Sequence, residues 1–101
     1  MEFLINKNSE TVTVTIKGEF DANSVPMIRS DLDAIVEAKP RLVIVDLSSL
    51  KLIDSTGVGG IVSLFKRTRA YGGDFKVTGV QGQPQSIFKV LRLDRVFETD
   101  A

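Results

Sequence analysis

The sequence contains no cysteine and no histidine. Without cysteine there can be no disulfide, no thiolate nucleophile and no metal site built on thiolates. Without histidine the chain lacks the commonest general base near neutral pH and the commonest metal ligand. The remaining options are a metal site made of carboxylates alone, a mechanism that uses serine, threonine, lysine or carboxylates, or no catalysis.

The sequence also lacks net charge and long apolar runs. Thirteen Lys and Arg residues balance thirteen Asp and Glu residues, so the chain has no overall field to attract nucleic acid or an anionic membrane. No run approaches the roughly 18 apolar residues that a membrane-spanning helix needs. The mixed, acidic start MEFLINKNSE is unlike a secretory signal. We therefore expect a cytoplasmic protein with no nucleic-acid or membrane partner.

Length and composition predict one globular domain that spans residues 1–101. A chain of 101 residues has the usual size of a single domain. Hydrophobic residues make up 43% and charged residues 26%, which is typical of a soluble globular fold. Strand-like and helix-like segments alternate along the chain, and this alternation predicts the α/β class.

Short apolar segments predict the strands of a sheet. The clearest is the second, where Val12, Val14 and Ile16 alternate with polar residues and so share one face. Residues 42–45 are apolar throughout, which favours a central strand buried on both faces. The predicted strands are residues 3–5, 11–17, 42–45 and 75–77, followed by 96–97 as a last strand or a packed tail.

Apolar residues at helical spacing predict three helices between these strands. The first begins after an N-cap at Asn23 or Ser24 and ends before Pro40. The second follows Asp54, and the third covers residues 84–93. The residues expected to face inward are Ile28, Leu32, Ile35 and Val36 on the first, Val58, Ile61, Val62 and Phe65 on the second, and Ile87, Val90 and Leu91 on the third.

The segment after Asp54 has an unusual composition. Gly57, Gly59 and Gly60 lie in the first turns of the second helix, although each glycine costs roughly 0.8–1 kcal/mol relative to alanine inside a helix. Either Gly59 and Gly60 let the helix pack closely on the sheet, or the first turn must stay accessible to another molecule. Asp54 is suited to cap the helix, because its carboxylate can accept from the first-turn amides.

Ser55 occupies the first position of this helix, where the free amides and the helix dipole favour anions. No Gly-Lys-Ser/Thr follows the glycines, so a nucleotide-binding P-loop is not supported. An enzyme with a Ser55–Asp54 centre would lack its base, because histidine is absent and nothing places Lys51 beside the serine. We expect no catalytic residues.

Three segments together resemble the STAS domain, and within that family the bacterial anti-sigma factor antagonists. They are Gly18–Asp21 (GEFD), Val45–Ser48 (VDLS) and Ile53–Gly59 (IDSTGVG). The likeness extends over nearly the whole chain, including Gly72–Gly73 and Leu93–Phe97. It implies a single STAS-like α/β domain, in which α-helices pack against a small mixed β-sheet.

The resemblance implies a switch rather than an enzyme. Unphosphorylated members of this group bind an anti-sigma factor, usually also a serine kinase, and so release the sigma factor. The kinase phosphorylates the serine after the motif aspartate, here Ser55, and the modified protein dissociates. A PP2C-type phosphatase restores the binding form. The resemblance implies no cofactor and no metal.

The expected partner surface is the exposed edge of the second helix with the loops that lead to it. On a helical wheel, four residues lie beside the core stripe: Gly60, Leu64, Arg67 and Tyr71. Leu64 and Tyr71 would alternatively pack on the last helix. Asp21 lies in a loop that family members use for binding. The full set of expected partner contacts is Asp21, Asp54, Ser55, Thr56, Gly57, Gly60 and Leu64.

Two alternatives stay open at this point. One is a STAS module of a partner-switching pathway that does not act on a sigma factor, such as biofilm or secretion control. The other is a STAS domain that senses a nucleotide or a small apolar ligand. The chain has only six Phe and one Tyr, most of them at core-like positions, and this argues against an aromatic ligand pocket.

Overall fold

Helices follow single strands or pairs of strands along the chain, in keeping with the predicted α/β class. A computed structural model describes residues 1–100, with the side chains of residues 1–97. The elements in that range are β1 (Glu2–Asn8), β2 (Thr11–Phe20), α1 (Val25–Ala38), β3 (Leu42–Asp46), β4 (Leu50–Ile53), α2 (Ser55–Ala70), β5 (Asp74–Thr78), α3 (Gly82–Val90), α4 (Leu93–Val96) and β6 (Glu98–Asp100).

The strands form one mixed sheet in the order β1-β2-β3-β5-β6, with β4 paired to β2 outside this path. β1 and β2 form an antiparallel hairpin, whereas the other pairs are parallel. The α/β class and the small mixed sheet are therefore confirmed. β2 runs to Phe20, beyond the predicted end, because its first half pairs with β3 and its last residues pair with β4.

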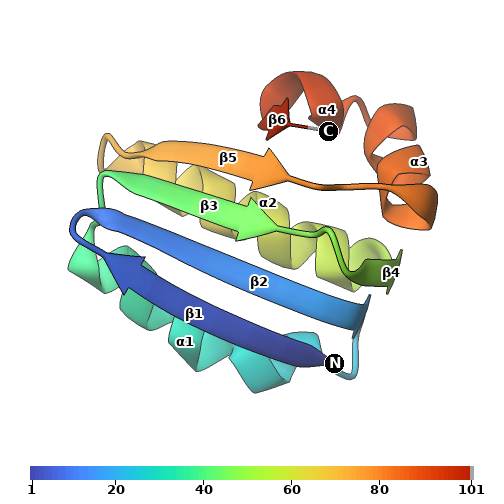
Figure 1. The fold of residues 1–101 in the computed structure, drawn as a ribbon, viewed down its shortest axis with the longest axis horizontal. Helices are drawn as coiled ribbons and strands as arrows, with labels where there is room; N and C mark the ends of the chain where they lie inside the picture. The colour runs from blue at the N-terminus through green and yellow to red at the C-terminus, as the bar shows by residue number, and fades with distance from the viewer. Residues whose placement is uncertain (101) are drawn as a thin grey trace.

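Both long helices lie on the same face of the sheet. Figure 1 shows α1 and α2 behind the strands. The strand residues that face these helices form the core, and Val14, Val43, Val45 and Val77 are fully buried. On the opposite face Ile44 is only half-buried. The prediction that residues 42–45 are buried on both faces is therefore wrong, because neither long helix covers the second face.

β4 has no counterpart among the predicted strands. It is four residues long, and its two buried residues, Leu50 and Ile53, are three positions apart. This spacing does not follow the period of two by which strands are recognised. The strand forms because its backbone pairs with the end of β2, after a register shift between Gly18 and Glu19.

The C-terminal region differs from the prediction in which residues face inward. Val90 is 77% exposed and Leu91 52% exposed, so their predicted inward orientation is wrong. Phe88 on α3 is fully buried instead. Phe97 is buried too, with its ring centroid 5.2–5.7 Å from those of three other Phe residues, which confirms a packed tail at this position. The last strand, β6, begins at Glu98, two residues later than predicted, because Val96 still belongs to α4.

Candidate functional site

The ends of two parallel strands bring the two candidate loops together. Gly18–Phe20 of β2 pairs with β4, so the loop before α1 and the turn before α2 leave the same edge of the sheet. The amide of Asp54 donates to the carbonyl oxygen of Phe20 at 3.4 Å. Asp21 and Asp54, which are 33 positions apart in the sequence, therefore belong to one site.

The carboxylate of Asp54 holds both loops. Its Oδ1 accepts a hydrogen bond from the Gly57 amide at 2.8 Å, which confirms the predicted helix cap. Its Oδ2 accepts from the Ala22 amide at 3.1 Å, a contact that the sequence did not indicate. The hydrogen bond from Gly57, supported by that from Ala22, lowers the pKa of Asp54 below its ordinary value, against a smaller opposing effect of desolvation. The carboxylate is therefore ionised at neutral pH.

Asp21 organises the start of α1. Its Oδ1 accepts hydrogen bonds from the amides of Asn23 and Ser24, both at 3.0 Å. Ser24 is the N-cap residue, as predicted, but its side chain makes no capping bond to the helix. Its hydroxyl instead accepts from the Asp21 amide at 2.8 Å and donates to the Glu19 carbonyl at 3.1 Å. The half-buried Asp21 thus has a structural role in this loop.

Ser55 and Thr56 are exposed at the start of α2, where the sequence places them. Ser55 borders a hollow of about 250 Å³ between α2 and α3, which we call the Ser55 hollow. Apart from Asp54 and Ser55 its lining is entirely apolar, with Ile53, Val58, Ile87, Val90 and Leu91. The exposure of Val90 and Leu91, unexpected from the sequence, is what gives this surface its apolar character.

The side chain of Gln83 positions α3 beside the site, and the sequence did not single it out. Its Oε1 accepts from the Ile53 amide and its Nε2 donates to the Ile53 carbonyl, both at 2.9 Å. These two bonds connect the first turn of α3 to the residue before Asp54. A lone glutamine at a helix start gives no sequence signal for such a contact.

The three glycines of α2 have different roles. A Cβ at Gly57 would lie 2.1 Å from the Phe20 carbonyl oxygen, so this buried glycine lets α2 approach the end of β2. A Cβ at Gly60 would lie 3.4 Å from the Phe20 ring, which also supports packing, whereas a Cβ at Gly59 would meet nothing within 4 Å. Close packing is therefore the wrong explanation for Gly59. Gly57 is buried against β2 and offers little surface of its own, and its expected contact with the partner stays a prediction.

Leu64 faces α1 rather than the exposed edge of α2. It is 3% exposed and lines a hollow between α1 and α2. The hydroxyl of Tyr71 points the same way, and donates to the Pro40 carbonyl at 2.7 Å. Leu64 therefore lies neither on the free edge of α2 nor against the last helix, because α1 and α2 lie side by side on one face of the sheet. Its expected contact with the partner stays a prediction.

Among the side chains that the structure describes, those of residues 1–97, no cluster of three or more His, Cys, Asp or Glu is placed to hold a metal ion. Within the same range no helix has the length and apolar character needed to cross a membrane. What the site offers is an exposed hydroxyl at a helix N-terminus, two structured carboxylates and an apolar surface. This combination is suited to protein recognition and to modification of the hydroxyl.

Known proteins with similar sequences cover almost the whole chain. The STAS domain family matches residues 2–101. The anti-sigma-B factor antagonist of Bacillus subtilis (strain 168) is 29% identical over 97 residues, which cover 96% of this chain and 88% of that protein. The anti-sigma-B factor antagonist of Listeria monocytogenes is 25% identical over 93 residues, which cover 91% of this chain and 81% of that protein.

Solved structures show the same fold. The unphosphorylated form of the anti-sigma factor antagonist SpoIIAA has a TM-score of 0.80 and 20% identity, covering 99% of this chain and 88% of its own. An anti-sigma factor antagonist from Mycobacterium paratuberculosis has a TM-score of 0.84 and 20% identity, and the match covers 97% of this chain and 83% of that protein's chain. The phosphorylated form of the Bacillus protein SpoIIAA matches with a TM-score of 0.80. In sequence motif and in fold, this chain belongs to the STAS domain family.

Proposed function

We propose that this chain is a protein-binding switch controlled by phosphorylation of Ser55. Unphosphorylated, it binds an anti-sigma factor that is also a serine kinase and so relieves the inhibition of a sigma factor. The observation that carries the proposal is the exposed position of Ser55, directly after the capping Asp54 and on the rim of the apolar Ser55 hollow. The similar proteins named as anti-sigma-B factor antagonists support it.

The Ser55 hollow supplies the apolar part of the proposed interface. Val90 and Leu91 line it, and Leu52, 49% exposed, lies in the adjoining depression with Asp21 and Asp54. Contiguous exposed apolar surface with a polar rim is typical of protein interaction sites. A partner that inserts an apolar side chain there comes close to the Ser55 hydroxyl.

Phosphorylation would release the partner without unfolding the protein. A phosphate on Ser55 adds a charge of roughly −1.5 to −2 at neutral pH. The first-turn amides and the dipole of α2 tolerate that charge. At the interface it would lie against the apolar hollow and near the ionised Asp54, where it costs desolvation and repulsion. Each ~1.4 kcal/mol of such cost weakens binding tenfold.

The proposal assigns no catalytic step to this chain. The kinase activity belongs to the partner, and a PP2C-type phosphatase removes the phosphate from Ser55. The exposure of Ser55 at a helix start supports access by both enzymes. We further propose that the switch works in the cytoplasm and needs no cofactor, nucleic acid or membrane.

The test is affinity capture from the native lysate with the wild type, Ser55→Ala and Ser55→Asp, followed by mass spectrometry. We expect wild type and Ser55→Ala to retain an anti-sigma kinase and Ser55→Asp to retain less of it, with phosphate mapped to Ser55 of the wild type. Ser30→Ala is the matched control, because Ser30 is an exposed serine of α1 that lines neither hollow, and it should behave as wild type. Phosphate mapped mainly to Thr56, or equal capture by all variants, would contradict the proposal. A kinase recovered from a pathway without a sigma factor would contradict only the assigned output.

A further inference from the structure

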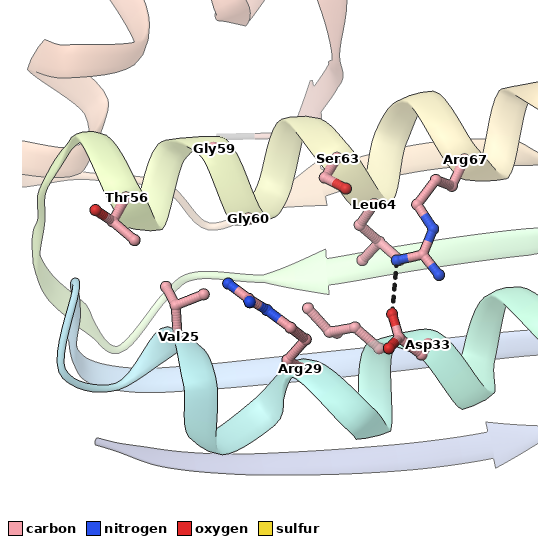
Figure 2. Close-up of a pocket in the computed structure, with 10 residues that line it drawn as sticks. Val25, Arg29, Asp33, Thr56, Gly59, Gly60, Ser63, Leu64 and Arg67 are labelled. Carbon is pink, nitrogen blue, oxygen red and sulfur yellow. Dashed lines mark hydrogen bonds and ion pairs between the residues drawn. The ribbon is translucent and has the colours of Figure 1, made fainter.

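A second hollow lies between the two long helices (Figure 2), and it shares no lining residue with the Ser55 hollow. We call it the α1–α2 groove; its volume is about 430 Å³. Val25, Leu32 and Leu64 give it an apolar floor, and Arg29, Gly59 and Thr56 lie along its sides. Because Thr56 follows Ser55 in the chain, the groove begins one residue from the proposed phosphorylation site.

Arg29 is the one groove cation without a carboxylate in the described part of the chain. Figure 2 shows its side chain extending from α1 into the space between the helices. It is exposed and, among the described residues, forms no hydrogen bond or ion pair. Arg67, at the other end of the groove, is neutralised by Asp33, with its Nη1 2.8 Å from Oδ1. The groove therefore carries one uncompensated positive charge, next to an apolar floor.

Gly59 is the second unusual feature of this groove. A glycine inside a helix costs roughly 0.8–1 kcal/mol relative to alanine. At Gly57 and Gly60 the contacts with β2 explain the missing side chain, but at Gly59 the space beside the backbone is open. The fold itself thus gives no reason for a glycine here. A molecule that lies close to the backbone of α2 would give one.

We propose that the α1–α2 groove receives a segment of the partner protein that carries an acidic side chain next to an aliphatic one. The carboxylate pairs with Arg29, the aliphatic side chain enters the groove above its buried apolar floor, and the segment passes over the exposed backbone at Gly59. This inference rests on the proposed function, because one partner would span the groove and the Ser55 hollow. Negative charge at Asp21 and Asp54 and positive charge at Arg29 would together fix the orientation of the partner.

The experiment measures the affinity of the purified partner kinase by calorimetry for the wild type and for Arg29→Glu. Arg41→Glu is the matched control, because Arg41 is an exposed arginine outside the groove with only a 3.4 Å ion pair to Glu10. We expect Arg29→Glu to weaken binding about tenfold or more, more strongly at low salt, and Arg41→Glu to leave it unchanged. Gly59→Gln, which fills the groove from an open position, should also weaken binding. Circular dichroism checks that each variant is folded.

Exchanging the two charges of the proposed ion pair tests directly whether Arg29 pairs with an acidic residue of the partner. Replacing single acidic residues of the partner by arginine should identify one replacement that restores the affinity of Arg29→Glu. Suppose that the wild type binds the partner kinase and that phosphorylation of Ser55 releases the kinase. If Arg29→Glu and Gly59→Gln then bind the kinase as tightly as the wild type, the groove inference is wrong and the proposed function stands. If the wild type binds no such kinase, the proposed function itself fails.

Discussion

Gly57 and Gly59 are two positions apart on α2, yet replacing each by alanine should change stability in opposite directions. At Gly59 the new methyl group meets nothing within 4 Å. The substitution then only removes the conformational freedom of a helical glycine, and we expect the free energy of unfolding to rise by about 0.8–1 kcal/mol.

At Gly57 the methyl group would lie 2.1 Å from the Phe20 carbonyl oxygen and 2.8 Å from Cγ1 of Ile53. The oxygen belongs to the backbone of β2 and cannot rotate away, so α2 must move from the sheet and strain the Asp54 cap. Overpacking of this kind costs about 1–3 kcal/mol, and the gain in helix propensity offsets only part of it. We expect Gly57→Ala to be destabilised by about 1–2 kcal/mol.

Urea denaturation followed by circular dichroism measures both changes. The same differences should appear as melting temperatures about 4 °C higher or more for Gly59→Ala and lower for Gly57→Ala. Gly60→Ala serves as the intermediate case, because its methyl group would lie 3.4 Å from the Phe20 ring. A stabilised Gly57→Ala, or a destabilised Gly59→Ala, would refute the distinction between the packed and the open glycine.

Three further substitutions test the contacts that build the site. Asp54→Ala removes the acceptor for the Gly57 and Ala22 amides, so its urea midpoint should fall. Folding lowers the pKa of Asp54 below its ordinary value of 3.8, so the ionised carboxylate stabilises the fold above pH 3.8 and loses this effect as the pH falls further. The difference in unfolding free energy between wild type and Asp54→Ala should therefore shrink in acid. Gln83→Ala should cost about 1–3 kcal/mol in urea denaturation, because two hydrogen bonds to Ile53 are lost. Phe97→Ala should cost about 3–5 kcal/mol in the same assay, since its buried ring contacts three other Phe rings. If any of these three variants is as stable as the wild type, the contact that it removes does not contribute to stability as described.

The sequence predicts β2 and the two long helices because their burial follows a regular period, whereas β3 is recognisable only as a continuous apolar run. Val12, Val14 and Ile16 alternate along β2, and they are all buried as expected. The Asp54 cap is also predictable, because it depends on a local contact with the third residue after it.

Contacts between distant segments could not be predicted in this way. β4 depends on pairing with β2, and the orientation of Leu64 depends on α1 and α2 sharing one face of the sheet. Val90 and Leu91 are apolar and lie at helical spacing, but that spacing does not say whether a protein core or a partner will cover them. The apolar surface beside Ser55 therefore becomes visible only in the structure.

The most direct test of the proposed switch compares four forms of the protein: unphosphorylated, phosphorylated at Ser55, Ser55→Ala and Ser55→Asp. Partner affinity is measured by calorimetry, and amide NMR shifts record any change in the fold. We predict tight binding of the unphosphorylated and Ser55→Ala forms, intermediate binding of Ser55→Asp and release of the phosphorylated form, with shifts confined to the start of α2 and its neighbours. Undiminished binding of the phosphorylated protein, or shifts spread over β1 and the far end of the sheet, would contradict a local steric and electrostatic switch.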